Sequence, residues 1–168
     1  GEGQTVNMTV TPAEGWDVAA VKDSNGKTYT VAEAGGAVAY THTAGTVTVT
    51  AEFAQCAVCL ENTGSTTKTY YKTLSAAVAK VTADTDTITL LRDVALSSGD
   101  TVGTNSVYRL DLTQGFTLDL NGFVLSADNS LLRFMSGNTK ASAMTIKNGT
   151  LVAAVAGNAQ HLMAIYNY

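Results

Sequence analysis

The side chains that could carry out acid–base chemistry are a few scattered aspartates. Hydrolysis of a glycosidic bond uses two carboxyl groups about 5–10 Å apart. The only Asp-x-Asp pair is Asp84-Thr-Asp86, which falls where a helix should give way to a strand and so indicates turn chemistry. Asp111 and Asp119 each lie between two leucines, which predicts that their carboxylates point to solvent from strands. No spacing among these acids identifies a catalytic pair.

The two cysteines, Cys56 and Cys59, form a Cys-x-x-Cys motif. A redox centre needs this motif at the opening of a helix after a strand, whereas here it lies between Phe53 and a Thr-rich stretch. A zinc site needs about four ligands, and the two histidines, His42 and His161, are far apart in the sequence. We therefore expect either a local disulfide or two reduced thiols at a domain junction, and neither a metal nor a cofactor. A Ser–His–Asp arrangement is equally unsupported, since His161 lies in an apolar segment and should be packed or exposed.

Composition limits the classes of protein. The chain has 168 residues, of which 45% are hydrophobic and only 14% charged, so it can bury a core and is not disordered. The net charge of −4 and the scattered Lys and Arg argue against nucleic acid as a partner. No apolar run approaches the roughly 20 residues that cross a bilayer, so we expect no membrane insertion.

Residues 1–54 predict a small antiparallel β-module of about five strands. Apolar and polar residues alternate in this region, and turn residues separate the runs. The tetrapeptide Asp23-Ser-Asn-Gly26 predicts a hairpin whose second strand is 27–31. The expected strands are 5–11, 16–21, 27–31, 38–41 and 46–53.

This region resembles the divergent internalin-type B-repeat domain of secreted and wall-attached bacterial proteins. The resemblance rests on Gln4–Trp16, Asn25-Gly26 and Ala44–Phe53. One departure is His42-Thr-Ala44, where the family usually has Met-Pro-Ala. The resemblance implies a stalk or spacer module without catalytic residues, with Trp16 in the core and His42 in a loop.

Residues 55–69 are rich in Thr, Ser, Gly and Asn and predict a linker, and 70–168 form the second module. Leu74, Ala77, Val78 and Val81 form one apolar helical stripe, so a short helix near 73–83 is expected, capped by Thr73 or Ser75. A strand should follow at 85–91. Further strands are expected at 108–112, 116–120, 123–125, 131–135, 144–146, 150–152 and 162–165.

Two Asn-Gly corners, each between short strands, repeat along the second module. Gly122 and Gly149 lie 27 residues apart, which suggests the coils of a solenoid. We predict that Leu120 pairs with Ile146, with Lys147 as an extra residue before the second corner. Leu118, Leu120, Met144 and Ile146 should then point inward.

The second module resembles the start of right-handed parallel β-helices of the pectate-lyase-like superfamily. The resemblance rests on Tyr71–Val78, Asp86–Val94 and Thr117–Gly122. It implies a helix over the first coil, strands stacked in register and asparagine ladders at corners. Lyases of this shape commonly use acidic calcium ligands and a basic side chain. The nearest candidates are Asp111, Asp119, Asp128, Arg109 and Arg133. No lyase or hydrolase signature is present, so we expect no catalytic residues.

The sequence thus predicts an all-β, two-module extracellular bacterial surface protein that acts as a non-catalytic spacer and adhesin. The alternative is a polysaccharide-binding or polysaccharide-degrading β-helix protein, with a host or cell-wall glycan or protein as partner. Exposed tyrosines could stack on sugars, and the candidates are Tyr70, Tyr71, Tyr108, Tyr166 and Tyr168. The segment 162–168 is apolar without an obvious capping helix. We therefore expect an open last coil, which continues in a longer protein or associates end to end with another chain.

Overall fold

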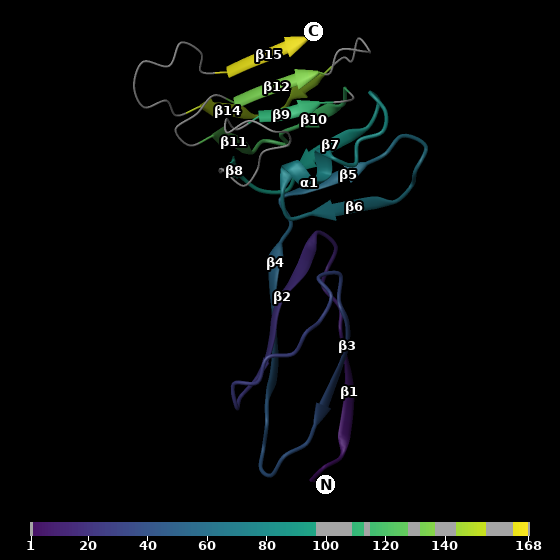
Figure 1. The fold of residues 1–168 in the computed structure, drawn as a ribbon, viewed down its shortest axis with the longest axis vertical. Coiled ribbons are helices and arrows are strands. Elements are labelled where there is room, and N and C mark those ends of the chain that lie inside the picture. Colours follow the sequence, from purple (N-terminus) through teal and green to yellow (C-terminus); the bar gives the residue numbers. More distant parts are fainter. Residues whose placement is uncertain are drawn as a thin grey trace. The chain divides into compact units, whose positions relative to one another are not determined.

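The computed structural model describes residues 2–96, 109–112, 115–127, 132–136, 144–153 and 163–167. Within these ranges the protein is mostly β-structure with one short helix, and its sheets close into no barrel. The chain divides into two compact units, Gly1–Gln55 and Cys56–Tyr168 (Figure 1). Each unit has its own hydrophobic core.

The first unit contains two antiparallel ladders in its described residues. Strand β1 (Thr5–Val10) pairs with β3 (Gly36–Thr41), and β2 (Trp16–Asp23) pairs with β4 (Val49–Gln55). The prediction of a fifth strand at 27–31 is wrong, because this segment bonds to β2 only through Asp23 N to Lys27 O and Tyr29 N to Val21 O. Only an isolated bridge between Lys22 and Thr28 remains of the expected hairpin.

The core of the first unit lies between apolar side chains of both ladders. Val18, Val21 and Val38 are buried there, with partly buried neighbours packed around them. Trp16 was expected in this core, but it is 42% exposed. It is the first residue of β2, opposite Gln55 at the end of the ladder, so the buried valines lie further along the strand. The prediction of a core tryptophan is therefore wrong.

The second unit begins with strands in the stretch 55–69 that was expected to be a linker. Strand β5 (Val58–Glu61) lies between β6 (Lys68–Tyr71) and β7 (Thr87–Leu90) and is antiparallel to both. Val58 and Leu60 are fully buried in it. The Thr-, Ser- and Gly-rich composition belongs to the turn between β5 and β6 rather than to a connection between units.

From β7 onward, each strand pairs in parallel with the strand three places later in the chain. One sheet has the order β13-β10-β7-β5-β6, a second β14-β11-β8 and a third β15-β12-β9 (Figure 1). The remaining strands are β8 (Val94–Leu96), β9 (Arg109–Leu112), β10 (Thr117–Asp119), β11 (Val124–Ala127), β12 (Leu132–Ser136), β13 (Thr145–Lys147), β14 (Thr150–Ala153) and β15 (Met163–Asn167).

The predicted register between β10 and β13 is wrong. Ile146 lies opposite Leu118 rather than Leu120, and Lys147 lies opposite Asp119. The reason is the length of the corners: residues 120–123 join β10 to β11, whereas only 148–149 join β13 to β14. The first corner therefore holds the extra residues. The predicted inward direction holds, because Leu118 and Leu120 are buried, and Met144 and Ile146 pack against the same core.

The single helix, α1 (Leu74–Val78), is shorter than the predicted 73–83. Thr73 caps it, as one of the two predicted alternatives, and its Oγ1 accepts a hydrogen bond from Ala76 N at 3.2 Å. The chain leaves the helix after Val78, since the Thr82 and Ala83 amides bond to the carboxylate of Asp86 instead. Leu74, Ala77 and Val78 are buried against the second core.

Replacing Thr73 with alanine should lower the free energy of unfolding of the second unit by about 1 kcal/mol, because the cap bond to Ala76 is lost. Urea unfolding followed by far-UV circular dichroism measures this change. Thr66→Ala is the matched control, since Thr66 is an exposed residue of the β5–β6 turn. Equal midpoints for the two variants would contradict a capping role.

Candidate functional site

The carboxylate of Asp86 is fully buried at the turn between α1 and β7. It accepts hydrogen bonds from Thr63 N at 2.7 Å, from Asn62 Nδ2 and Thr82 N at 2.8 Å, and from Thr82 Oγ1 and Ala83 N at 3.1 Å. These donors come from two separate turns, so one side chain ties the β5–β6 turn to the segment after α1. The prediction of turn chemistry for this residue agrees with these contacts.

The protonation of Asp86 also fits a structural role. Burial raises the pKa of this carboxyl, but the Thr63, Thr82 and Ala83 amides and the Asn62 side chain stabilise the anion. Their combined effect exceeds that of burial and holds the pKa of Asp86 far below its usual range. A carboxylate with a lowered pKa that already accepts several hydrogen bonds is a poor general acid or base at neutral pH.

Asp119, one of the predicted acids, also forms hydrogen bonds and an ion pair with neighbouring residues. Its carboxylate accepts hydrogen bonds from Asn121 N at 2.9 Å and from Asn148 Nδ2 at 3.1 and 3.2 Å. Lys147 Nζ lies 3.4 Å from its Oδ2. Burial raises the pKa of Asp119, but these donors and the ammonium outweigh it, so the pKa is lowered. Asp119 therefore links the first Asn-Gly corner to the second.

The asparagines at the corners have the left-handed backbone that the sequence predicts. The φ angles of Asn121 and Asn148 are 50° and 59°. Their side-chain amides donate to different groups. Asn121 Nδ2 donates to Leu90 O at 3.1 Å, whereas Asn148 Nδ2 donates to Asp119. Each asparagine side chain thus bonds to the end of the strand that precedes the previous corner. These bonds connect the corner after β10 to β7 and the corner after β13 to β10.

Asn121→Ala should destabilise the second unit by about 2 kcal/mol, because it removes the bond to Leu90 O and forces alanine into a left-handed conformation. Asn121→Gly is the matched control, since glycine loses the same bond but tolerates the backbone angle. Thermal unfolding should therefore rank wild type first, then the glycine variant, then the alanine variant. A glycine variant less stable than the alanine variant would contradict this explanation.

Three of the other predicted acids and bases lie together in the β9–β12 ladder. Arg109 lies opposite Arg133, and Asp111 follows two residues later in β9, opposite Met135. Asp119 belongs to a different sheet from Asp111. Asp128, His161, Tyr108 and Tyr168 lie outside the described residues.

The remaining candidates have structural surroundings. Cys56 and Cys59 are both buried, and no disulfide joins them in this structure. The His42 ring lies 6.3 Å from that of Tyr40. Tyr70 and Tyr71 are half-buried in β6, and Tyr71 packs against the second core. Tyr166 lies opposite Met135 in the β12–β15 ladder.

A second buried carboxylate, missed by sequence reasoning, holds the turn after β2 in the first unit. Asp23 accepts hydrogen bonds from Asn25 N and Lys27 N at 2.9 Å, and from the Tyr29 hydroxyl at 2.8 Å. The Tyr29 hydroxyl, with help from the two amides, lowers the pKa of Asp23. Burial, followed by the bond to Asp23, raises the pKa of Tyr29 to about 12. The Asp-Ser-Asn-Gly pattern indicated a turn but could not identify the tyrosine.

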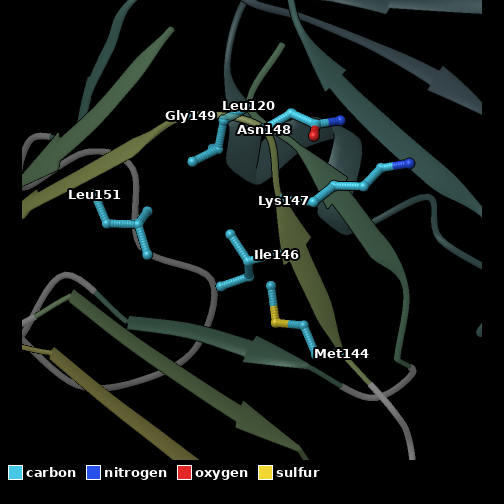
Figure 2. Close-up of a pocket in the computed structure, with 7 residues that line it drawn as sticks. All are labelled: Leu120, Met144, Ile146, Lys147, Asn148, Gly149 and Leu151. Carbon is cyan, nitrogen blue, oxygen red and sulfur yellow. The ribbon is translucent and has the colours of Figure 1, made fainter. Parts of the chain in front are cut away.

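A cavity of about 500 Å³ lies beside β13, and the sequence did not predict it. In Figure 2 the apolar side chains of Met144, Ile146 and Leu151 surround it, while the ammonium of Lys147 points away. The described residues that line it are Leu120, Met144, Ile146, Lys147, Asn148, Gly149 and Leu151. These residues include no carboxylate or histidine, and they suit apolar packing rather than catalysis.

Among the described residues, no group of three or more His, Cys, Asp or Glu side chains could hold a metal ion. The one helix in that part of the chain is far too short to cross a bilayer. Comparison of the chain with family models, curated proteins and solved structures gave no match.

Proposed function

We propose that this chain is a non-catalytic structural and adhesive module of a bacterial surface or secreted protein. In this proposal the second unit is the start of a right-handed parallel β-helix, and the first is a spacer repeat. The observation that carries the proposal is the pairing of each strand with the strand three places later, in three parallel sheets. Such repeated stacking builds a stiff surface to which further repeats add length.

The use of the polar side chains supports a structural role. The carboxylates of Asp86 and Asp119 accept hydrogen bonds from residues of turns and corners and hold these segments in place. Asp23 does the same in the first unit. Carboxylates engaged in this way serve stability rather than turnover. The resemblances to internalin-type repeats and to the pectate-lyase-like superfamily add the extracellular bacterial setting to the proposal.

Adhesion and catalysis are separated by two measurements on the whole chain. Bacterial cell walls and host cells are incubated with labelled protein, and a polysaccharide panel is assayed for reducing ends and for unsaturated products. We expect saturable binding to a cell or wall preparation and no product. Release of either product would overturn the non-catalytic proposal. Absence of binding to every cell and wall preparation would overturn the adhesive part of the proposal.

Glycan binding is the second candidate, and one observation favours it. Trp16 and Phe53 are both 42% exposed. They lie on the same face of the β2–β4 ladder, because Trp16 is opposite Gln55, two residues from Phe53. Neighbouring aromatic rings on one face can stack on sugar rings.

A glycan array tests this candidate directly. Trp16→Ala should lower the affinity for any bound glycan at least about tenfold, which corresponds to one lost stacking interaction. Val6→Ala is the control, since Val6 is 48% exposed on β1 and offers no ring. Equal binding by the two variants would count against the aromatic platform.

A further inference from the structure

Three Asn-Gly pairs occur in the chain, Asn25-Gly26, Asn121-Gly122 and Asn148-Gly149, and the structure describes all of them. Asparagine is one of the thermally labile residues of proteins. A following glycine makes it more so, because a residue without a Cβ leaves its backbone nitrogen free to attack the preceding side-chain amide. The three pairs share the same reacting atoms. Differences in reactivity between them must therefore come from the fold.

The two pairs of the second unit are held by hydrogen bonds to distant parts of the chain. Asn121 Nδ2 donates to Leu90 O at 3.1 Å, and Asn148 Nδ2 donates to both carboxylate oxygens of Asp119. Gly122 N, which would have to attack Asn121, donates to Asn148 O. Turning either side chain toward the next backbone nitrogen breaks these bonds, and each broken bond slows the reaction.

Close packing adds a further restraint to the third pair. A Cβ at Gly149 would overlap Leu120 Cβ and lie 2.6 Å from Phe123 O, so the backbone of this glycine has no free space on that side. Nothing lies within 4 Å of the corresponding position at Gly26 or Gly122. The attack closes a five-membered ring and rearranges the glycine backbone. Such a rearrangement meets a neighbour at Gly149 and open space at Gly26.

The pair in the first unit has only local restraints. Asn25 is exposed, and its side-chain amide bonds to none of the described residues. The turn is held by Asp23, whose Oδ1 accepts from Asn25 N and Lys27 N at 2.9 Å and whose carbonyl accepts from Gly26 N at 3.0 Å. All three bonds lie within residues 23–27. Gly26 N can therefore leave its acceptor by a local opening of one turn, which costs little free energy.

We propose that Asn25-Gly26 is a site of spontaneous deamidation in the folded protein, whereas the fold protects the other two Asn-Gly pairs. Gly26 N forms a bond to Asn25 Cγ, the Cγ–Nδ2 bond breaks, and the amide group leaves as ammonia with the proton that Gly26 N has lost. Water then opens the cyclic imide at either carbonyl group. The product is aspartate or isoaspartate in place of Asn25, and water is the only other reactant.

The reaction changes the turn in which it takes place. Either product adds a carboxylate next to that of Asp23, which accepts the hydrogen bond from the Tyr29 hydroxyl at 2.8 Å. Isoaspartate also lengthens the backbone between Asp23 and Lys27 by one carbon, so the bonds that close the turn lose their geometry. Deamidation would therefore loosen the attachment of Tyr29 to this turn as the protein ages.

Peptide mass spectrometry on the whole chain follows all three sites during incubation in mildly alkaline buffer. In the folded protein we expect Asn25 to react at least about tenfold faster than Asn121 and Asn148, because their reaction requires one or two additional hydrogen bonds to break. In guanidinium chloride the three rates should become similar, since the fold no longer protects any site. Equal rates at the three sites of the folded protein, or an Asn25 as slow as the other two, would overturn the proposal.

Asn25→Gln is the matched variant, because glutamine keeps the neutral amide but would have to close a six-membered ring, which forms more slowly. The variant should lose the early release of ammonia, while Asn121 and Asn148 react as they do in wild type. Early release that persists in the variant would assign the reaction to another residue and overturn the proposal. None of these results bears on adhesion, so the proposed function is tested separately.

Discussion

Asp86→Ala should lower the free energy of unfolding of the second unit by about 3 kcal/mol, because several neutral donors lose one shared acceptor and an unsatisfied buried donor costs about 1–3 kcal/mol. The substitution leaves the Thr63, Thr82 and Ala83 amides without the buried carboxylate that accepts their hydrogen bonds. An unsatisfied buried donor costs free energy that its neighbours cannot recover. Urea unfolding followed by far-UV circular dichroism measures the loss.

The chain offers two controls for this experiment. Asp84 belongs to the same Asp-x-Asp pair but is exposed, so Asp84→Ala should change stability by no more than about 0.5 kcal/mol. Trp16, the single tryptophan, lies in the first unit, so its fluorescence follows that unit alone. Asp86→Ala should shift the circular-dichroism transition and leave the fluorescence transition in place. If Asp84→Ala lowered the free energy of unfolding as much as Asp86→Ala does, the hydrogen bonds of Asp86 would not be the cause of its effect.

The same carboxylate predicts a loss of stability in acid. The folded state lowers the pKa of Asp86 below its unfolded value of about 3.9, so the unfolded state binds a proton first as the pH falls. The stabilisation is complete above that value and is lost as the pH falls through the lower folded pKa. The stability difference between wild type and Asp86→Asn should therefore shrink between about pH 5 and pH 2. A constant difference over this interval would show that the anionic form is not what the donors stabilise.

The sequence predicts strands well where apolar and polar residues alternate over a short run. The run around Leu118 in the second unit shows this, because a period of two leaves one choice of inward face. The same period does not determine which residue of one strand lies opposite which residue of the next. The register of Ile146 depends on the number of residues in the corner after β10, and corner length is a property of the folded chain.

The contacts of single polar side chains are harder still to predict. An Asn-Gly corner predicts a left-handed asparagine from local sterics, and Asn121 and Asn148 have that conformation. Their amides, however, bond to atoms about 30 residues earlier in the chain, at Leu90 and Asp119. Trp16 shows the same limit in the other direction. The resemblance to the internalin-type repeat implies a core position, but the place of Trp16 at the end of a ladder leaves it exposed.

Gly149→Ala should destabilise the second unit by about 3 kcal/mol, the upper end of the usual cost of overpacking. A Cβ at this position would overlap Leu120 Cβ and lie 2.6 Å from the carbonyl oxygen of Phe123. The clashing atom of Leu120 is its Cβ, which is fixed to the backbone, and Phe123 O accepts a hydrogen bond from Thr150 N. Thermal unfolding of the variant should show the loss.

Gly122→Ala separates crowding from backbone strain. Gly122 has a φ of 83°, but nothing lies within 4 Å of the Cβ that alanine would add. Strain alone costs about 1–2 kcal/mol. Gly149 does not have a positive φ. Glycine is needed there because a side chain would collide with Leu120 and Phe123. Gly149→Ala should therefore be the more destabilising of the two variants, although Gly122 has the unusual backbone angle. The reverse order would mean that the two corners do not approach as closely as Leu120 and Gly149 do in this structure.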